Sequence, residues 1–511
     1  MPIWPKSRTA RVAQPNETKF PRMRAASDFA RREEAERERR LAEYDRMADE
    51  RDRWVRKNSA YYAGIARLAR FIIPENASVL EIGCGTGDLL ASLKPRDGLG
   101  IDIAPRLVDR ARAKHPQLQF LVSDAETLAA PELDGRTFDY VVMSDVIGML
   151  TDVWSAFRAL RRVCHARTRI LITYYNFLWE PALRLGERIG RKMPISQQNW
   201  LSPSDIQNLL ELNHFDVVRQ GTAQLVPIHV PLISTLANRY VALMPGMSEL
   251  ALTHYFVCHL EGGGGPVHER DYSCSVIVPC KNERGNIDAI IERMPEMGRG
   301  TELIFVDGNS TDGTVAAIEH HLKTKTRDGM KLIHQGDGRG KGDAVRKGFA
   351  AATGDILFIL DADLTVPPED LPKFYAALAE GKAEFVNGSR LAYPMEGEAM
   401  RLLNTIGNKV FGLSISAILE QRLKDTLCGT KVLFRRDYER IAAARGFFGD
   451  FDPFGDFDLL FGAAKQNLKI VELPVRYRAR TYGETKIDRF RHGAILAKMT
   501  WHAFRKFRKA Y

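Results

Sequence analysis

A run of four glycines followed by a proline, at residues 262–266, most limits how this chain can fold. Such a run can hold neither a helix nor a strand, so we expect it to separate two domains. With 511 residues, the chain is also too long for one ordinary core. Apolar strands alternate with helical stretches from about Tyr61 to Leu260, and again from Tyr272 onwards. The sequence therefore predicts two α/β domains, each a layered, Rossmann-like unit.

The predicted organisation has five parts. These are a basic arm and charged helix (1–60), a first domain (61–261), a glycine-rich linker (262–271), a second domain (272–488) and a basic amphipathic tail helix (489–511). Within the first part, residues 31–53 hold eight basic and nine acidic residues and almost nothing apolar. This pattern is typical of a solvated helix with paired charges four positions apart. We expect that helix to lie outside the core, and we expect the linker to leave the two domains without a fixed channel between them.

The net charge of +10 argues against a nucleic-acid partner once its location is considered. Residues 1–24 carry +5 and residues 489–511 carry +7, so the rest of the chain carries 10 − 12 = −2. A nucleic-acid enzyme normally spreads its basic surface over the folded body. The six cysteines show no CxxC pair, the first residues lack a signal-peptide core, and no window is long and apolar enough to span a membrane. We therefore expect a cytoplasmic protein, peripheral at most to the cytoplasmic face of a membrane.

The first domain contains a strand, a glycine turn and a helix in "ASVLEIGCGTGDLLASL". Glycines at alternate positions let the backbone pass close to a ligand, and amides at the following helix start favour a negative group. Acids follow the next strands, at Asp102, at Asp124 with Glu126, and at Asp145 after Ser144. The ends of parallel strands meet at one edge of a sheet, so these acids predict a polar crevice there.

These motifs resemble those of class I S-adenosylmethionine-dependent methyltransferases over roughly residues 61–260. The resemblance implies S-adenosylmethionine as cofactor. It places the methionine portion by Glu81, Gly83, Gly85 and Gly87, the ribose by Asp102, and the adenine by Asp124 and Ala125. An aromatic group beyond the later strands could form the acceptor pocket or only core: Tyr174, Tyr175, Asn176, Trp179 and Trp200. The sequence identifies no general base.

In the second domain, the apolar run "ILFIL" leads into "DADLTVPPEDL". Side chains alternate along a strand, so Asp361 and Asp363 would point the same way and repel each other. Two readings follow: a strand end with an ordinary turn, or a divalent cation held by carboxylates and substrate phosphates. The preceding motifs favour the cation, because Asp307 ends a strand and "GDGRGKGDAVRKGF" is suited to approach a diphosphate.

The order of these motifs resembles family 2 glycosyltransferases, which have the GT-A fold, over about residues 272–490. The resemblance implies a nucleotide-diphosphate sugar donor and Mg²⁺ or Mn²⁺ held at Asp361 and Asp363. It implies a donor pocket formed by Pro279, Asn282, Glu283, Asp307, Lys341 and Asp361. Many relatives have a second Asp where this chain has Gly308. Because Gly308 has no carboxylate, the nucleotide contacts that the second Asp makes in those relatives are not expected in this chain.

Within the family, "NGSRL", "DTLCGTKVLFRR" and "RTYGETK" resemble segments of dolichyl- and polyprenyl-phosphate sugar synthases. The likeness implies that four cations face phosphates of the donor or of a polyprenyl-phosphate lipid: Arg390, Lys431, Arg480 and Lys486. A hydroxyl acceptor would need a base, for which Asp456 or Asp458 is the candidate, whereas a lipid phosphate would need none. With a phosphate acceptor, Asp458 would orient the site or cap a helix.

We therefore expect a bifunctional enzyme of cell-envelope glycan synthesis that joins methyl transfer to inverting, metal-dependent sugar transfer. The alternative is a glycosyltransferase acting on a sugar hydroxyl, with a first domain that binds S-adenosylmethionine only to regulate it.

The tail helix has two sides at 100° per residue. One side gathers apolar residues: Phe490, Ala494, Leu496, Ala497, Trp501, Phe504, Phe507 and Tyr511. The other gathers Arg491, Lys498, Arg505, Lys506 and Lys509. Such a helix can dock on the second domain or bind an anionic membrane surface, and the absence of acids in 489–511 favours the membrane.

Overall fold

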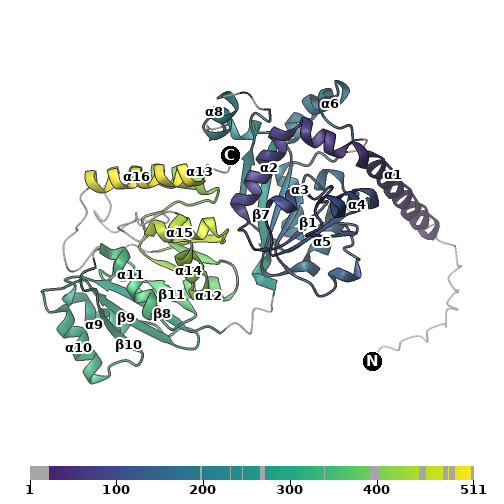
Figure 1. Cartoon of the computed structure of the whole chain (residues 1–511). Helices are drawn as coiled ribbons and strands as arrows, with labels where there is room; N and C mark the ends of the chain where they lie inside the picture. Colours follow the sequence, from purple (N-terminus) through teal and green to yellow (C-terminus); the bar gives the residue numbers. More distant parts are fainter. Residues whose placement is uncertain are drawn as a thin grey trace, which may run out of the picture.

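The structure is a computed structural model and describes residues 22–195, 198–228, 230, 232–243, 246–264, 271–338, 340–390, 402–447, 456–475, 482 and 489–507. Figure 1 shows two sheet domains side by side, with the long helix α1 reaching out at the end of the first. No described helix is long and apolar enough to cross a membrane.

The first domain holds seven strands in the order β3-β2-β1-β4-β5-β7-β6. The strands are β1 (Ser78–Ile82), β2 (Asp97–Asp102), β3 (Gln119–Val122), β4 (Phe138–Ser144), β5 (Cys164–Tyr175), β6 (Phe215–Ala223) and β7 (Thr253–Leu260). Its helices are α1 (Arg22–Lys57), α2 (Ser59–Ile72), α3 (Asp88–Ser92), α4 (Pro105–Lys114), α5 (Val153–Leu160), α6 (Glu180–Arg188), α7 (Pro203–Leu212) and α8 (Ile233–Arg239). All neighbours are parallel except β7, which is antiparallel to β5 and β6.

The second domain also holds seven strands, in the order β10-β9-β8-β11-β13-β12-β14. The strands are β8 (Cys274–Cys280), β9 (Thr301–Asp307), β10 (Met330–His334), β11 (Ile356–Ile359), β12 (Phe385–Ser389), β13 (Lys431–Phe434) and β14 (Ile470–Pro474). Its helices are α9 (Arg284–Arg293), α10 (Thr314–Thr324), α11 (Gly340–Ala351), α12 (Leu371–Ala379), α13 (Leu402–Leu419), α14 (Arg435–Ala443), α15 (Asp456–Lys465) and α16 (Arg489–Phe507). Only β13 runs antiparallel to its neighbours. The predicted two-domain α/β fold is confirmed.

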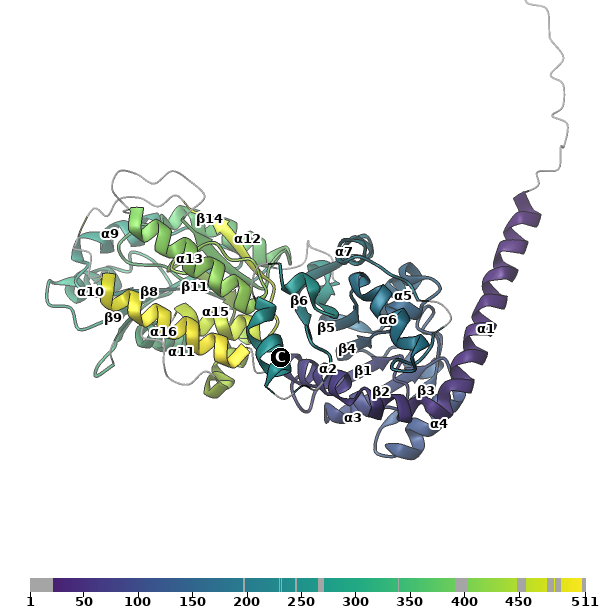
Figure 2. The ribbon, with the colours of Figure 1, turned by 90° about the horizontal axis from the view of Figure 1, so that it is seen from above.

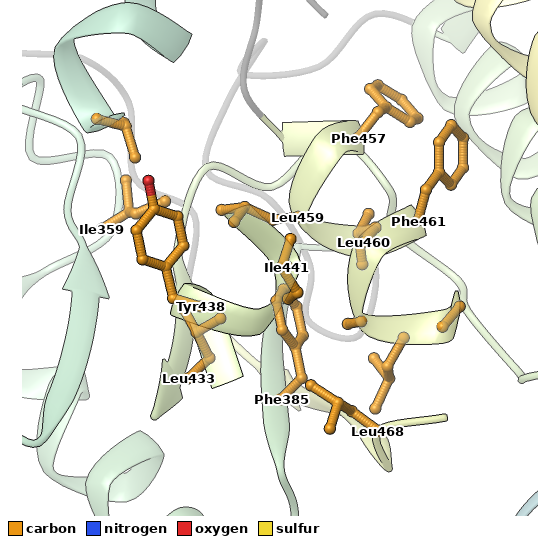
Figure 3. Close-up of a cluster of buried hydrophobic side chains, with 14 of the residues drawn as sticks. Ile359, Phe385, Leu433, Tyr438, Ile441, Phe457, Leu459, Leu460, Phe461 and Leu468 are labelled. Atoms are coloured by element: carbon orange, nitrogen blue, oxygen red, sulfur yellow. The ribbon is translucent and has the colours of Figure 1, made fainter. Parts of the chain in front are cut away.

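The central strands are apolar because helices cover both faces of a parallel sheet. All five residues of β1 and all four of β11 are buried. In the second domain one core cluster joins sheet residues such as Phe385 and Leu433 to helix residues of α14 and α15, among them Ile441 and Phe461 (Figure 3). These layers fix the strand ends, from which the functional side chains extend.

Two strand boundaries differ from the prediction. β11 ends at Ile359, so Asp361 and Asp363 lie in the turn that follows and strand alternation does not orient them. β3 likewise ends at Val122, two residues before Asp124. In both cases a polar turn takes over as soon as the apolar run ends, because backbone hydrogen bonds to side-chain oxygens replace the ladder. Asp363 accepts such a bond from the amide of Thr365, at 3.1 Å.

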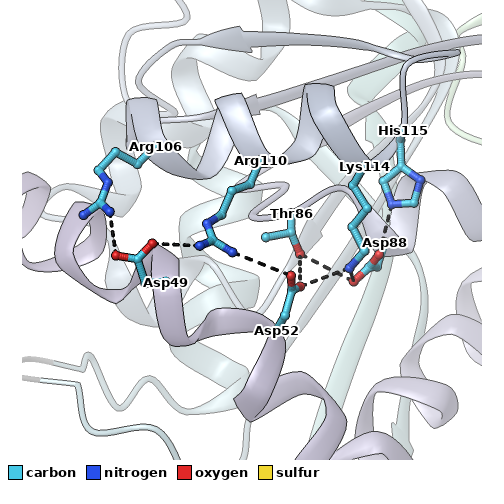
Figure 4. Close-up of polar contacts among 8 residues, drawn as sticks. All are labelled: Asp49, Asp52, Thr86, Asp88, Arg106, Arg110, Lys114 and His115. Carbon is cyan, nitrogen blue, oxygen red and sulfur yellow. Dashed lines mark hydrogen bonds and ion pairs between the residues drawn. The ribbon is translucent and has the colours of Figure 1, made fainter.

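The sequence predicts a solvated charged helix outside the core, but α1 packs on the first domain. Ala48 of α1 is fully buried against α4, in a cluster with Ala104 and Leu107. Asp49 pairs with Arg106 and Arg110 of α4, at 2.5 and 2.7 Å (Figure 4). Charges of α1 therefore form tertiary ion pairs with α4, and α1 is part of the first domain's packing.

The linker is not the only connection between the domains. Arg219 of β6 is 1% exposed and donates to Glu420, just after α13, at 2.7 Å. Lys469 pairs with Asp216 at 2.7 Å, and Arg169 donates to the backbone oxygen of Asn467 at 2.7 Å. Buried polar contacts therefore hold the two domains together, which the glycine-rich linker alone did not predict.

The tail helix α16 packs mainly on the second domain. Leu496, Met499, Ala503 and Phe507 are at most 7% exposed and belong to that domain's core. Leu496 and Phe507 were expected on the membrane side, and that expectation is wrong, because α13 and the core bury them. Trp501, by contrast, is 56% exposed. Phe490, Arg491, Ala494, Lys509 and Tyr511 lie outside the side chains that the structure describes.

Candidate active sites of the two domains

The first domain contains a cavity of about 360 Å³ at the carboxyl ends of its parallel strands. Its walls include the predicted cofactor residues Glu81, Gly83, Gly85, Asp102, Asp124 and Ala125. Gly87 is absent from the wall; it lies at the start of α3 with a φ of +79°, where a side chain would also strike Phe120. The structure thus brings six of the seven predicted residues to one cavity.

Two buried acids organise the glycine loop. Asp102 accepts hydrogen bonds from the amides of Gly85 and Ala104, at 2.9 and 3.0 Å. Glu81 accepts one from the amide of Leu90, at 3.0 Å. Burial raises the pKa of the Glu81 carboxyl to about 8 and also raises that of Asp102. Both carboxylates therefore gain from any positive group that enters the cavity.

Helix α1, which lies outside the predicted domain, and helix α2, at its start, also line the cavity. Arg51 and Trp54 of α1, with Tyr61 and Tyr62 of α2, line it. Arg51 donates to the hydroxyl of Tyr62 at 3.0 Å, and its Nε lies 3.6 Å from where a Cβ on Gly85 would be. None of these four residues was predicted from the sequence as a site residue. The two tyrosines of the amphipathic segment "NSAYYAGIARLARFI" were a usable signal, whereas Arg51 is indistinguishable within its charged run.

Of the five predicted acceptor residues, only Tyr175 lines this cavity. Tyr174 is buried and stacks on His254 and Phe256, so it belongs to the core. Two others fix nearby backbone: Asn176 donates to the oxygens of Glu249 and Ala251, and Trp179 donates to that of Leu250. Trp200 is half-buried and is not in the wall.

The second domain places Asp361 beside Lys341, with 2.6 Å between Oδ1 and Nζ. Burial alone would raise the pKa of the Asp361 carboxyl, but Lys341, Lys431 and Arg390 hold it below its usual value. Gly429 presses against this pair: a Cβ there would lie 2.0 Å from Asp361 Oδ2 and 2.6 Å from Lys341 Nζ. Only glycine therefore lets the backbone pass this close to the Asp361–Lys341 pair.

The predicted nucleotide residues surround the loops after β8 and β9. Asp307 is buried and accepts from the amide of Ser310, at 3.2 and 3.3 Å. Asn282, with a φ of +56°, accepts from the amide of Thr311 at 2.8 Å. The Glu283 carboxylate accepts from the side-chain Nδ2 of Asn286 at 2.9 Å, and Pro279 lies in β8 beside Val306. These contacts tie the two loops together into one wall.

The predicted phosphate-facing cations are less exposed than expected. Arg390 makes a two-pronged pair with Asp425, at 2.8 Å on each side, and Asp425 is fully buried. Lys431 is fully buried in β13 and donates to the oxygen of Cys428 at 2.5 Å. Both still contribute positive potential at Asp361. Arg480 and Lys486 lie outside the described residues.

The candidate bases are placed as follows. Asp458 lies in the first turn of α15, where its Oδ2 accepts from Arg445 Nε at 2.8 Å. This ion pair fits an orienting role better than that of a free base. Asp456 begins α15, but its side chain lies outside those described. Among described residues, no group of three or more His, Cys, Asp or Glu is arranged to hold a metal.

Each of the two domains matches a known protein family. Residues 52–220 match the family model described as a methyltransferase domain, and residues 275–441 match the model for glycosyl transferase family 2. The chain thus contains a methyltransferase domain at residues 52–220, followed by a family 2 glycosyltransferase domain at residues 275–441.

Among curated relatives, the dolichol-phosphate mannosyltransferase of Saccharomyces cerevisiae is 40% identical over 123 residues, covering 23% of this chain and 45% of that protein. That of Pyrococcus furiosus is 28% identical over 222 residues, covering 42% of this chain and 58% of that protein. The chain therefore spans about half the length of these two relatives.

Two solved structures are also similar. Glucosyl-3-phosphoglycerate synthase from Mycobacterium tuberculosis has 18% identity and a TM-score of 0.34, over 48% of this chain and 84% of that chain. A SAM-dependent methyltransferase from Thermotoga maritima has 19% identity and a TM-score of 0.34, over 43% and 99%.

Proposed function

We propose that the second domain transfers a sugar, with inversion, from a nucleotide-diphosphate sugar to a polyprenyl phosphate. The observation that carries this is the Asp361–Lys341 pair pressed against the backbone of Gly429, next to Asp363. This group supplies carboxylate oxygens and a cation that would bind the diphosphate leaving group of the donor. The names of the curated relatives support a lipid-phosphate acceptor.

A divalent cation fits this site. Asp361 and Asp363 would hold Mg²⁺ or Mn²⁺, hard ions that prefer oxygen ligands and complete their shell with phosphate oxygens. When bound, the ion neutralises charge on the leaving diphosphate. Lys341 adds a second positive group beside Asp361, and Asp307 with Glu283 would hold the nucleotide. The phosphate acceptor is already anionic at neutral pH, so the reaction needs no base to activate it, in keeping with the pairing of Asp458 to Arg445.

For the first domain we propose transfer of a methyl group from S-adenosylmethionine. Glu81 and the glycine loop would surround the methionine portion, Asp102 would accept from the ribose, and Asp124 with Ala125 would flank the adenine. Arg51 lines the same cavity beside Gly85, where it suits the methionine carboxylate. We further propose that the domain boundary lies within α1, because α1 forms part of this cavity.

We also propose that the protein binds peripherally to the cytoplasmic face of a membrane. Large apolar side chains are exposed on α13, α16 and α8, including Leu413 (73%), Trp501 (56%) and Leu236 (54%). The rings of Tyr240 and Phe504 lie 5.8 Å apart, so α8 is next to α16. Figures 1 and 2 show these helices along one side of the molecule. The exposed cations Lys498 and Arg505 of α16 favour an anionic surface.

The test uses the full chain with a panel of sugar nucleotides and Mn²⁺, first by thermal shift and then by transfer. Dolichyl phosphate should be glycosylated, whereas dolichol, which lacks the phosphate, should not. Excess EDTA should stop transfer. Equal transfer to dolichol would refute the phosphate acceptor, and undiminished turnover in EDTA would refute the metal. Calorimetry with S-adenosylhomocysteine tests the first domain separately: no binding would refute its proposed cofactor.

A further inference from the structure

Asp145 is an acid of the first domain's cavity without a part in the proposed cofactor binding. Asp145 follows β4 and has a φ of +58°, a conformation that side chains seldom adopt away from functional sites or turns. Its amide donates to the oxygen of Thr173 at 2.9 Å, which fixes it in this position. Asp145 lines the cavity together with the predicted cofactor residues.

Two hydroxyl groups hold the Asp145 carboxylate. Tyr61 of α2 donates to Oδ2 at 2.7 Å, and Thr173 of β5 donates to Oδ1 at 3.1 Å. Tyr61 is 5% exposed and packs against Tyr62 and Tyr175, with ring centroids 5.3 and 5.5 Å away. The carboxylate is therefore preorganised as an acceptor, with free lone pairs still available for a proton from a substrate.

The cavity that Asp145 lines also has apolar walls. They include Leu183, Met193, Ile195, Pro227 and Ile228. Ile228 is 63% exposed, so the cavity lining reaches the surface there. On α6, Leu185 and Ile189 are also exposed, at 56% and 63%. Polar and apolar walls in one cavity match an amphiphilic molecule better than a free sugar.

The charged neighbours that act on the Asp145 carboxyl favour a neutral hydroxyl over an amine at this point of the cavity. They are the cations Arg51 and Lys192, whereas other acids of the cavity, such as Glu81 and Asp102, bond to the glycine turn and the helix that follows it. Lys192 Nζ lies 5.8 Å from the centre of the Tyr175 ring. An amine would arrive as an ammonium ion at neutral pH and would meet these like charges. A hydroxyl carries no charge but must lose its proton when it is methylated.

We infer that Asp145 is the general base for methylation of a hydroxyl group on an amphiphilic, lipid-like acceptor, and that Tyr61 positions it. This rests on the proposed methyl transfer from S-adenosylmethionine. The acceptor oxygen forms a bond to the methyl carbon as the sulfur–carbon bond breaks. The hydroxyl proton passes to the Asp145 carboxylate, and the products are a methyl ether and S-adenosylhomocysteine.

The experiment uses the full chain, methyl-labelled S-adenosylmethionine and three probes: n-octyl glucoside, glucose and n-octylamine. Octyl glucoside should form a methyl ether, detected by mass spectrometry, whereas glucose and octylamine should react at least tenfold more slowly. Asp145→Asn should lower this rate about 100-fold or more while the Kd for S-adenosylhomocysteine stays within twofold. Asp139→Asn, at the opposite end of the same strand, is the matched control and should keep the rate.

Tyr61→Phe separates positioning from a structural role. The groups facing Asp145 are Tyr61, Thr173, Arg51 and Lys192, all of which lower its pKa against the effect of burial. Loss of the Tyr61 hydroxyl should therefore raise the pKa of Asp145 and move the acid limb of the rate profile to higher pH.

Several outcomes would overturn the inference. They are full activity in Asp145→Asn, faster methylation of octylamine or glucose, an unmoved acid limb in Tyr61→Phe, and no methylation of octyl glucoside by a protein that binds S-adenosylhomocysteine. Failure to bind S-adenosylhomocysteine would instead refute the proposed cofactor.

Discussion

The buried ion pair between Arg219 and Glu420 should be the most sensitive point of the contact between the domains. Arg219 is 1% exposed, and its guanidinium lies over the rings of Phe71 and Tyr255, at 5.5 and 5.7 Å. Glu420 is 9% exposed and also accepts from the Tyr255 hydroxyl. The carboxylate fits against Gly221, where a Cβ would lie 2.7 Å from its oxygens.

We predict that Glu420→Gln costs about 3–5 kcal/mol of stability, because it leaves the Arg219 charge buried without its counter-charge. For a domain of about 150–250 residues, this loss of stability corresponds to a fall of roughly 6–20 °C in Tm. The neighbouring cation Lys465 should increase this loss of stability, because it is repelled by the Arg219 charge. Burial and the nearby Arg219 already lower its pKa to about 8, which shows how strongly this interface disfavours unbalanced positive charge.

Differential scanning calorimetry of the full chain measures the effect. The double variant Arg219→Met/Glu420→Met should recover most of the loss, since replacing both charges by apolar groups is often neutral. Arg293→Gln is the exposed control. Its pair with Glu369 is 33% and 54% exposed, so its loss should cost less than about 1 kcal/mol. A Tm for Glu420→Gln within 2 °C of the unaltered protein would show that this interface is not closed in solution.

Three further predictions address the site, the membrane and pH. Asp363→Ala should abolish sugar transfer with little change in Tm; retained transfer would exclude it from the site. Trp501→Ser with Leu413→Ser should reduce co-sedimentation with anionic vesicles at low salt, while Leu212→Ser, at an equally exposed position on α7, should not; equal loss in both would exclude the α13–α16 face. Burial lowers the pKa of His259 from 6.5 to about 4, so the fold holds it neutral and its contribution disappears as pH falls through that range. In urea unfolding between pH 7 and pH 4, the His259→Leu variant should therefore lose less of its free energy of unfolding than the unaltered protein does, and equal losses would contradict this.

Truncation of the tail, residues 489–511, would be a poor test of membrane binding. Met499, Ala503 and Phe507 are part of the second domain's core, so their removal would expose apolar surface and destabilise the domain. Substitution of the outward-facing Trp501 leaves that packing in place. The sequence pattern showed that the helix has an apolar side, but it could not show which neighbour covers it.

Sequence alone determined the local motifs of this protein. Both sheets could be predicted because buried parallel strands are continuous apolar runs, and each glycine turn or acid follows its strand within a few residues. Glu81, Asp102 and Asp361 could be predicted to lie at or near the ends of strands in this way, since their positions depend on a strand–turn–helix unit that lies within one short segment.

Only the tertiary structure decided which distant groups meet. Arg219 and Glu420 are 201 residues apart, and Tyr61 and Asp145 are 84 apart. No periodicity connects such pairs, because packing of whole helices and sheets brings them together. For the same reason Arg51 was read as a solvated charge. Its position in the cavity depends on how α1 lies across α4, which is fixed by acids and bases from two segments about 60 residues apart (61 for Asp49 and Arg110).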